Sequence, residues 1–196
     1  MNIKSKHELN AIIRYEKKLY PNTFLDCLTN DQRVYNWRFM RLLRYSEYYG
    51  RRKQSNLLFL ILWLFFRRKR NTLGCKIGVQ IQEGSFDKGL VIHHNGSIVV
   101  SGGARVGMNC QLHGDNCIGN IGKSGQEGCP VIGDNVSIGV GAKILGPITI
   151  ASNVIIGANA VVISSCYESG ISLVGVPAKK VLPIRNEAQQ DDIPID

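Results

Sequence analysis

An aliphatic residue returns at every sixth position over much of the second half of the chain. One set reads Val100, Val106, Leu112 and Ile118, and a second reads Ile132, Ile138, Ile144, Ile150, Ile156 and Val162. A fixed period indicates a repeat architecture, in which each unit buries its apolar face by stacking on its neighbours. Six residues are too few for a helical unit and too regular for hairpins, so a short strand followed by a tight turn fits best.

Three such units would close one triangular coil, and stacked coils would place the aliphatic residues in columns inside a prism. The residues available for turns with positive φ are Gly133, Asn135, Gly141, Asn153, Gly157 and Asn159. The sequence therefore predicts a mainly β fold, a parallel β-helix. The hand of the coil does not follow from the repeat itself.

Four motifs make this prediction more specific. They occupy residues 89–100 (GLVIHHNGSIVV), 118–125 (IGNIGKSG), 138–146 (IGVGAKILG) and 175–179 (GVPAK). Together they resemble the hexapeptide-repeat acyltransferases, and within them the serine acetyltransferase branch and its polysaccharide O-acetyltransferase relatives. The resemblance covers about residues 74–182. It implies a left-handed β-helix, acetyl-CoA as co-substrate and a homotrimer.

The chain divides into three parts by composition. Residues 1–70 carry 16 Lys and Arg against 5 Asp and Glu, whereas residues 71–196 carry 8 against 10. We therefore expect a basic helical segment over 1–70, a β-helix over 74–182 and a polar tail over 183–196. Within the first part, one helix is predicted over 7–19. A second is predicted from Asp31 as cap to Tyr49, with Gly50 as its stop.

The second helix is predicted to be amphipathic. Its apolar face is Tyr35, Phe39, Leu42 and Leu43, and the opposite, solvent-exposed face carries Arg33, Arg41 and Arg44.

Ten apolar residues over 57–66 are followed at once by four basic residues over 67–70. As a helix the apolar run spans only about 15 Å, half of a bilayer core, so it cannot cross a membrane. Two interpretations fit. The helix is buried against its neighbours or another subunit, or 57–70 makes peripheral contact with anionic lipid. Nucleic acid is not predicted as a partner, because no recognition motif accompanies the charge.

Six cysteines occur without a CxxC pair, and the polar first residues form no signal peptide. A cytoplasmic protein with reduced thiols is therefore expected. Lipid contact through 57–70 would make it peripheral at the inner face of the membrane. The cysteines within the coils are expected to be small packing residues. No metal-ligand cluster or phosphate-binding P-loop is present in the sequence.

Acetyl transfer to an alcohol needs a base, and His is the side chain suited to that task near pH 7. His94 lies six residues before Val100, where an aliphatic residue would be expected. It also matches the position of the catalytic His in the serine acetyltransferases. The alternative is a structural His at a subunit contact. His113 is either a second substrate-binding His or a coil-surface residue.

Three departures from the family bear on the acceptor. His93 stands where the family has an acidic residue that contacts the amino acid, and Cys129 where it has a substrate-binding His. No carboxylate occurs near Val79 or Gln80, where the family has the Asp that orients the catalytic His. A free amino acid requires charged partners, whereas a sugar hydroxyl does not.

The resemblance also implies where coenzyme A binds, in the cleft between neighbouring subunits. Val140 and Ala158 would line it through their backbones, while Gly122 and Lys123 would approach from a loop. That loop is predicted over 120–131, because Ile118 and Ile132 are fourteen positions apart and the period of six breaks there. Lys179 and Lys180 would meet the phosphates, unless they are simply solvated.

These residues together suggest an acetyl-CoA-dependent O-acetyltransferase that acts on a sugar hydroxyl of a surface polysaccharide or its precursor. One alternative is a serine O-acetyltransferase of cysteine biosynthesis. Another, from a different class, is a non-catalytic β-helix scaffold.

Overall fold

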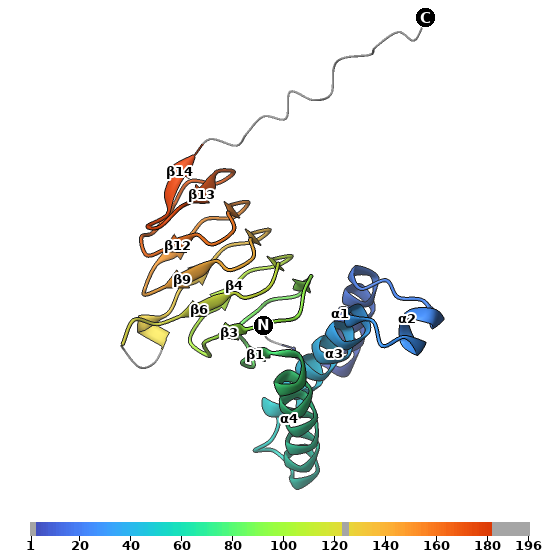
Figure 1. The fold of residues 1–196 in the computed structure, drawn as a ribbon. Coiled ribbons are helices and arrows are strands. Elements are labelled where there is room, and N and C mark those ends of the chain that lie inside the picture. Colours follow the sequence, from blue (N-terminus) through green and yellow to red (C-terminus); the bar gives the residue numbers. More distant parts are fainter. Residues whose placement is uncertain (1–2, 123–125, 182–196) are drawn as a thin grey trace, which may run out of the picture.

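The computed structural model describes residues 3–122 and 126–181. Figure 1 shows a helical segment at one end of a stack of short strands. The helices are α1 (Lys6–Leu19), α2 (Phe24–Leu28), α3 (Gln32–Gly50) and α4 (Leu57–Ile77). α3 packs against α1 and α4, and α4 leads directly into the first coil.

Polar caps set where the helices begin. The side chains of Ser5, Thr23, Asp31 and Asn56 accept hydrogen bonds from backbone N–H groups in the first turns of α1, α2, α3 and α4. The predicted helix over 7–19 and the predicted Asp31 cap are confirmed. Gly50 is the last residue of α3 rather than the residue after it.

The helical segment extends further than the sequence predicts. The coils were expected to begin at Gly74, but α4 continues to Ile77 and ends at Gly78, which adopts φ +70°. Gly74 is needed for close approach rather than for a turn, since a Cβ there would lie 2.4 Å from the carbonyl oxygen of Val79. The change from helix to coil therefore falls at Gly78.

The strands form three sheets, which are the three walls of a left-handed parallel β-helix. The first wall contains β1 (Val79–Ile81), β3 (Ile98–Val100), β6 (Cys117–Gly119), β9 (Lys143–Leu145) and β12 (Val161–Val162). The second contains β4 (Arg105–Val106), β7 (Val131–Ile132) and β10 (Thr149–Ile150). The third contains β2 (Val91–Ile92), β5 (Gln111–Leu112), β8 (Ser137–Ile138), β11 (Ile155–Ile156), β13 (Ser172–Val174) and β14 (Lys179–Val181). Among the strands of the described residues, β14 alone is antiparallel to its neighbour, β13.

The predicted aliphatic columns are confirmed. In the first wall Val100 pairs with Ile118, which pairs with Ile144, and the column continues to Val162. All ten residues of the two sixfold sets are buried. Cys110, Cys129 and Cys166 are buried among them, and burial raises the pKa of the Cys110 thiol to about 11. These three thiols are thus packing groups, as predicted, whereas Cys117 is only partly buried.

The turns only partly follow the prediction. Asn135, Gly141, Asn153 and Asn159 have positive φ, but Gly133 and Gly157 do not. Gly133 instead allows two coils to approach, because a Cβ there would lie 2.6 Å from the backbone nitrogen of Ser152. The loop predicted over 120–131 is confirmed where it is described. It projects from one corner of the prism and contains the short helix η1 (Gln126–Gly128).

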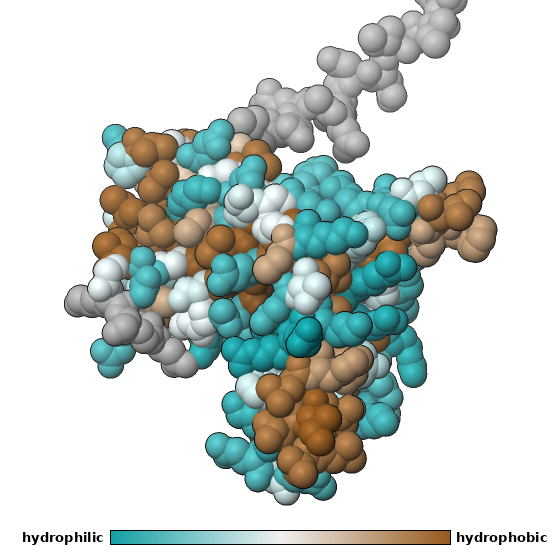
Figure 2. All heavy atoms as spheres, turned by 60° about the horizontal axis from the view of Figure 1, so that its bottom comes forward, coloured by the Kyte–Doolittle hydropathy of each residue, from teal (hydrophilic) through white to brown (hydrophobic). Residues whose placement is uncertain are grey.

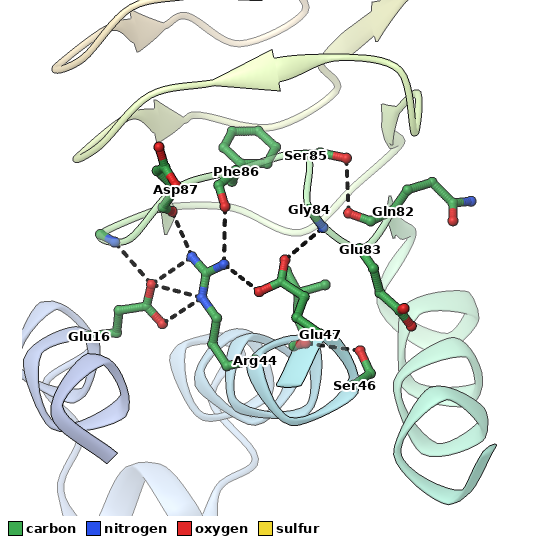
Figure 3. Close-up of polar contacts among 12 residues, drawn as sticks. Glu16, Arg44, Ser46, Glu47, Gln82, Glu83, Gly84, Ser85, Phe86 and Asp87 are labelled. Carbon is green, nitrogen blue, oxygen red and sulfur yellow. Dashed lines mark hydrogen bonds and ion pairs between the residues drawn. The ribbon is translucent and has the colours of Figure 1, made fainter. Parts of the chain in front are cut away.

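A buried ionic network joins the helical segment to the first coil (Figure 3). Arg44 of α3 contacts Glu16 of α1 at 2.7 Å and Glu47 at 2.9 Å, and it also donates to the carbonyl oxygens of Phe86 and Asp87. The prediction that Arg44 lies on a solvent-exposed face is therefore wrong. Carboxylates from two helices and two coil carbonyls satisfy the charge inside the protein, which the periodicity of one helix cannot reveal.

Candidate functional site

His94 lies at the corner where the chain passes from β2 in the third wall to β3 in the first. It was expected in the column of aliphatic residues, but Ile92 occupies the inward position and His94 is exposed. The reason is the length of the corner. Ile92 and Val100 are eight positions apart, whereas Leu112 and Ile118 in the next coil are six apart. The extra length carries the imidazole out of the prism and makes it accessible.

Two further histidines lie at this corner. The rings of His93 and His113 are stacked, with centroids 4.4 Å apart and planes at 11°. Nε2 of His93 lies 3.0 Å from Oε1 of Gln111, and Nε2 of His113 lies 3.1 Å from Oγ of Ser137. Burial, together with the nearby His93 and His94, holds the pKa of His113 below its usual value. The structure therefore brings His93, His94 and His113 together at one corner.

Gln32 contacts His94 and was missed in the sequence. Its side-chain amide nitrogen lies 3.3 Å from Nδ1 of His94. Gln32 is the first residue of α3 and is 62 positions away in the chain. The sequence indicated only that the family's orienting Asp is missing. At the two positions where it was expected, Val79 is buried in β1 and Gln80 points outward. A side chain from the helical segment thus reaches the imidazole nitrogen that a carboxylate would be expected to approach.

A column of small residues extends along this corner from His94 across the later coils. A Cβ on Gly114 would lie 3.4 Å from Cβ of His94 and 3.6 Å from Cγ2 of Val140. On the following coil, the backbone nitrogen of Asn159 donates to the carbonyl oxygen of Val140 at 2.8 Å, which places Ala158 beside Val140. Val140 and Ala158 are both exposed. The surface that extends from His94 along the coils is therefore apolar and exposed at Val140 and Ala158.

Of the two loop residues predicted to bind coenzyme A, Gly122 lies in a different part of the fold from His94. Gly122 is exposed, with φ +65°, in the loop that follows β6 and leads to the second wall. Lys123 lies outside the described residues. Within one chain, Gly122 is therefore at a different corner of the prism from His94, Val140 and Ala158.

The two lysines near the end of the coils differ in environment. Lys180 donates to Glu168 at 2.7 Å, and this hydrogen bond and the carboxylate charge raise the pKa of Lys180. Lys179 pairs in register with Val174, whose Cγ1 would lie 2.9 Å from a Cβ on Gly157. Paired residues of neighbouring strands point to the same face. Lys179 is therefore near the column of small residues, and Lys180 is engaged with Glu168.

A pocket of about 330 Å³ lies beside the His94 corner, between α3, the end of α4 and the first coil. Its lining residues are Asn30, Gln32, Tyr35, Lys76, Ile77 and Asn95. The side-chain oxygen of Asn95 is buried without a hydrogen-bond partner in the described part of the chain. A carboxylate, Asp115, lies at the same corner and accepts a hydrogen bond from the backbone nitrogen of Ser97 at 2.9 Å. The pocket thus offers mainly neutral polar groups with one cation, Lys76.

Cys129 has a packing role. It is buried, and its sulfur lies 3.3 Å from Oγ of Ser101. Among residues 3–122 and 126–181, no group of three or more His, Cys, Asp or Glu side chains is arranged to hold a metal ion.

The fold and the repeats define the class of protein. Residues 129–164 match the family described as bacterial transferase hexapeptide (six repeats). Those residues contain β7 to β12, the regular part of the coils. Over these residues the chain is therefore similar to the hexapeptide-repeat transferases.

Its homologues are serine acetyltransferases, by sequence and by structure. The chain is 41% identical over 101 residues to the serine acetyltransferase of Staphylococcus xylosus, a match that covers 51% of this chain and 46% of that protein. The Neisseria gonorrhoeae serine acetyltransferase in complex with serine is 26% identical, with a TM-score of 0.68 over 90% of this chain and 70% of that one. The soybean apoenzyme is 28% identical, with a TM-score of 0.67 over 88% and 67%. The chain thus matches about half the length of its curated relatives.

Proposed function

We propose that the chain is an acetyl-CoA-dependent O-acetyltransferase in which His94 takes the proton of an acceptor hydroxyl. One observation carries the proposal: an accessible imidazole stands next to Gly114, and the exposed residues Val140 and Ala158 continue from there along the coils. Its support from outside the chain is the similarity to serine acetyltransferases. A hydroxyl attacks a thioester poorly unless its proton is removed in the transition state, and a positioned His supplies that removal near neutral pH.

The reaction needs no residue beyond those at this corner to balance its protons. The acceptor oxygen forms a bond to the acetyl carbonyl carbon, and the carbon–sulfur bond breaks. The acceptor proton passes to Nε2 of His94 and from there to the departing thiolate. Val140 and Ala158 would support the pantetheine arm, and Lys179 would meet a phosphate. In a homotrimer, the loop with Gly122 would reach this corner from the neighbouring copy.

Serine is the acceptor that the comparisons support best, better than the sugar hydroxyl predicted from the sequence. The curated relatives that match the coils are serine acetyltransferases. A free amino acid needs partners for both of its charges. Lys76 in the pocket could pair with the carboxylate of serine, and Asp115 at the corner could pair with its ammonium group.

A sugar hydroxyl is the second candidate, and the character of the pocket favours it. Asn30, Gln32, Tyr35 and Asn95 supply neutral donors and acceptors, which suit a polyol. His93 stands where the relatives' acidic residue was expected, and its ring is engaged with Gln111 and His113. These groups would bind hydroxyls without requiring charge on the acceptor.

A thiol-release assay with acetyl-CoA tests the proposal. Turnover with L-serine or with a panel of sugar acceptors is expected, and absence of turnover with every hydroxyl acceptor would favour the scaffold alternative. His94→Ala should lower turnover by about 10²–10⁴-fold while coenzyme A binding, measured by calorimetry, persists. His7→Ala, at an exposed position on α1, is the matched control.

Lys76→Met separates the two acceptors. If serine is the acceptor, the variant loses the Lys76 ammonium group and its charge-assisted hydrogen bond to the serine carboxylate. KM for serine should then rise at least about tenfold. If a sugar is the acceptor, its KM should change little. The cytoplasmic location and the polar tail over 183–196 stay predictions.

A further inference from the structure

The N-terminal part of α4 presents an apolar stripe that no other described element covers. Its members are Leu57, Leu58, Ile61, Leu64 and Phe65, all between 51% and 71% exposed. They recur at the spacing of one helix face, while Phe66 on the opposite face stacks on Tyr45 and Tyr49 of α3. This part of α4 projects away from the coils (Figure 1). The stripe is therefore held in place by α3 and left open to its surroundings.

Basic residues flank this stripe in the sequence, although Arg70 is buried against Glu83 and Lys76 lines the pocket beside His94. No Asp or Glu occurs between Glu47 and Glu83, a stretch that contains eight basic residues. They are Arg51, Arg52, Lys53, Arg67, Arg68, Lys69, Arg70 and Lys76. Figure 2 shows the apolar patch at the protruding end of the helical segment, with hydrophilic surface on either side.

Lys69 lies at the edge of the stripe, 5.8 Å from the ring centroid of Phe65. Lys53 and Arg67 lie over the ring of Trp63, at 4.2 Å and 4.8 Å from its centroid, on the side of α4 that contacts Glu83. Arg68 and Lys69 are exposed in the turn that follows the stripe. The arrangement is an apolar face with a basic rim, which complements an apolar layer covered by anionic groups.

We propose that this surface of α4 docks the protein on an anionic phospholipid membrane. Among the described residues, no helix is both long enough and apolar enough to cross a bilayer. The helix would therefore lie in the interface, with Ile61, Leu64 and Phe65 among the acyl chains and the cations at the headgroups. The inference is independent of the proposed acetyl transfer.

Charge argues for lipid rather than a second copy of the chain. In a symmetric contact through this stripe, each basic rim would face its own copy, and no carboxylate between Glu47 and Glu83 could offset the repulsion. An anionic bilayer instead supplies the opposite charge at the same place as an apolar layer. Lipid is therefore the occupant that satisfies both features of the surface.

Vesicle flotation with the full-length protein tests the proposal. The protein should float with vesicles of phosphatidylcholine and phosphatidylglycerol, and much less with phosphatidylcholine alone. Raising the salt concentration should weaken the binding, because it screens the contribution of the basic rim. Failure to float with anionic vesicles at low salt would overturn the proposal.

Two sets of variants locate the surface. Ile61→Gln, Leu64→Gln and Phe65→Gln together, which keep good helix formers, should lower binding to anionic vesicles at least about tenfold. Arg68→Glu with Lys69→Glu, at exposed positions, should do the same. The matched control is Phe24→Gln, Leu25→Gln and Leu28→Gln on α2, which are 66% to 81% exposed but accompany the carboxylate of Asp26.

The control should bind like the unchanged protein. Equal binding by the α4 variants, or equal loss in the α2 control, would overturn the proposal. Light scattering without lipid tests the competing occupant: if the α4 variants break up an oligomer that the α2 control keeps, the stripe is a subunit contact and the membrane inference is wrong.

Discussion

The side-chain amide nitrogen of Gln32 lies 3.3 Å from Nδ1 of His94. A His that accepts a proton at Nε2 must carry its own proton on Nδ1, so the group facing Nδ1 has to be an acceptor. The oxygen and nitrogen of an amide side chain have nearly the same shape and exchange by rotation. With its oxygen turned toward the ring, Gln32 would hold His94 in the tautomer that the proposed reaction needs.

Gln32 is therefore expected to position His94. Gln32→Ala should lower kcat by about tenfold, a part of the factor of about 10²–10⁴ that a positioned base contributes. Gln32→Glu should retain activity, and the acidic limb of its pH–rate profile should move to higher pH, because a carboxylate favours the protonated ring. Arg41→Ala, at an exposed position of α3, is the control. An unchanged profile in Gln32→Glu would contradict the positioning role.

His113 should make the fold sensitive to mild acid. Because its pKa is lowered in the folded protein, the unfolded chain binds more protons below pH about 6.5, and stability falls as the pH drops through that value. His113→Gln should reduce this slope, which for one group is at most about 1.4 kcal/mol per pH unit. Urea denaturation between pH 5 and 7.5 measures it. Ser137→Ala removes a hydrogen-bond partner of His113 but keeps the titrating group, so its slope should match that of the unchanged protein.

The repeat could be predicted from the sequence because each coil contacts only its neighbours. The columns through Ile118, Ile138 and Ile150 follow from spacing alone, and their burial confirms it. The position of His94 could not be predicted in the same way. Counting back in sixes from Val100 assumes corners of equal length, but Ile92 and Val100 are eight positions apart, two more than Leu112 and Ile118 in the next coil.

The contacts between the helical segment and the coils could not be predicted from the repeat or from the pattern of one helix. Gln32 meets His94, and Glu16 meets Gly89, across more than sixty positions. A single-helix pattern assigned Arg44 to solvent because it could not include the carboxylates of two helices. Similarly, the paired lysines near the end of the coils looked equivalent until Glu168 was seen beside Lys180.

The different environments of Lys179 and Lys180 predict that the two lysines contribute unequally to the binding of acetyl-CoA. Lys179 lies on the face near Gly157, so Lys179→Ala should raise KM for acetyl-CoA about three- to tenfold with little change in kcat, as expected for lost uniform binding. Lys180 is already engaged with Glu168, and Lys180→Ala should have a smaller effect. Steady-state kinetics at low and high salt distinguish them, because a phosphate contact weakens with salt. Equal effects would argue that both lysines are simply solvated.

Arg44 should carry much of the docking of the helical segment on the first coil. Although burial disfavours its charge, Glu47 and Glu16 raise the pKa of Arg44 above its ordinary value, so it stays charged. Arg44→Met would leave both carboxylates buried without their cation, which costs about 3–5 kcal/mol. Arg41→Met, exposed on the same helix, should cost less than about 0.5 kcal/mol.

Urea denaturation gives the free energy of unfolding of both variants. Hydrogen exchange at Gly84 and Gly89, whose backbone N–H groups donate to Glu47 and Glu16, reports on the coil side of the contact. Faster exchange at these two glycines in Arg44→Met, with the later coils unchanged, is expected if the network fixes α1 and α3 to the coil. Because α3 also carries Gln32, the same variant should lower turnover by displacing the partner of His94. Full turnover with a loosened first coil would separate the two roles and contradict this coupling.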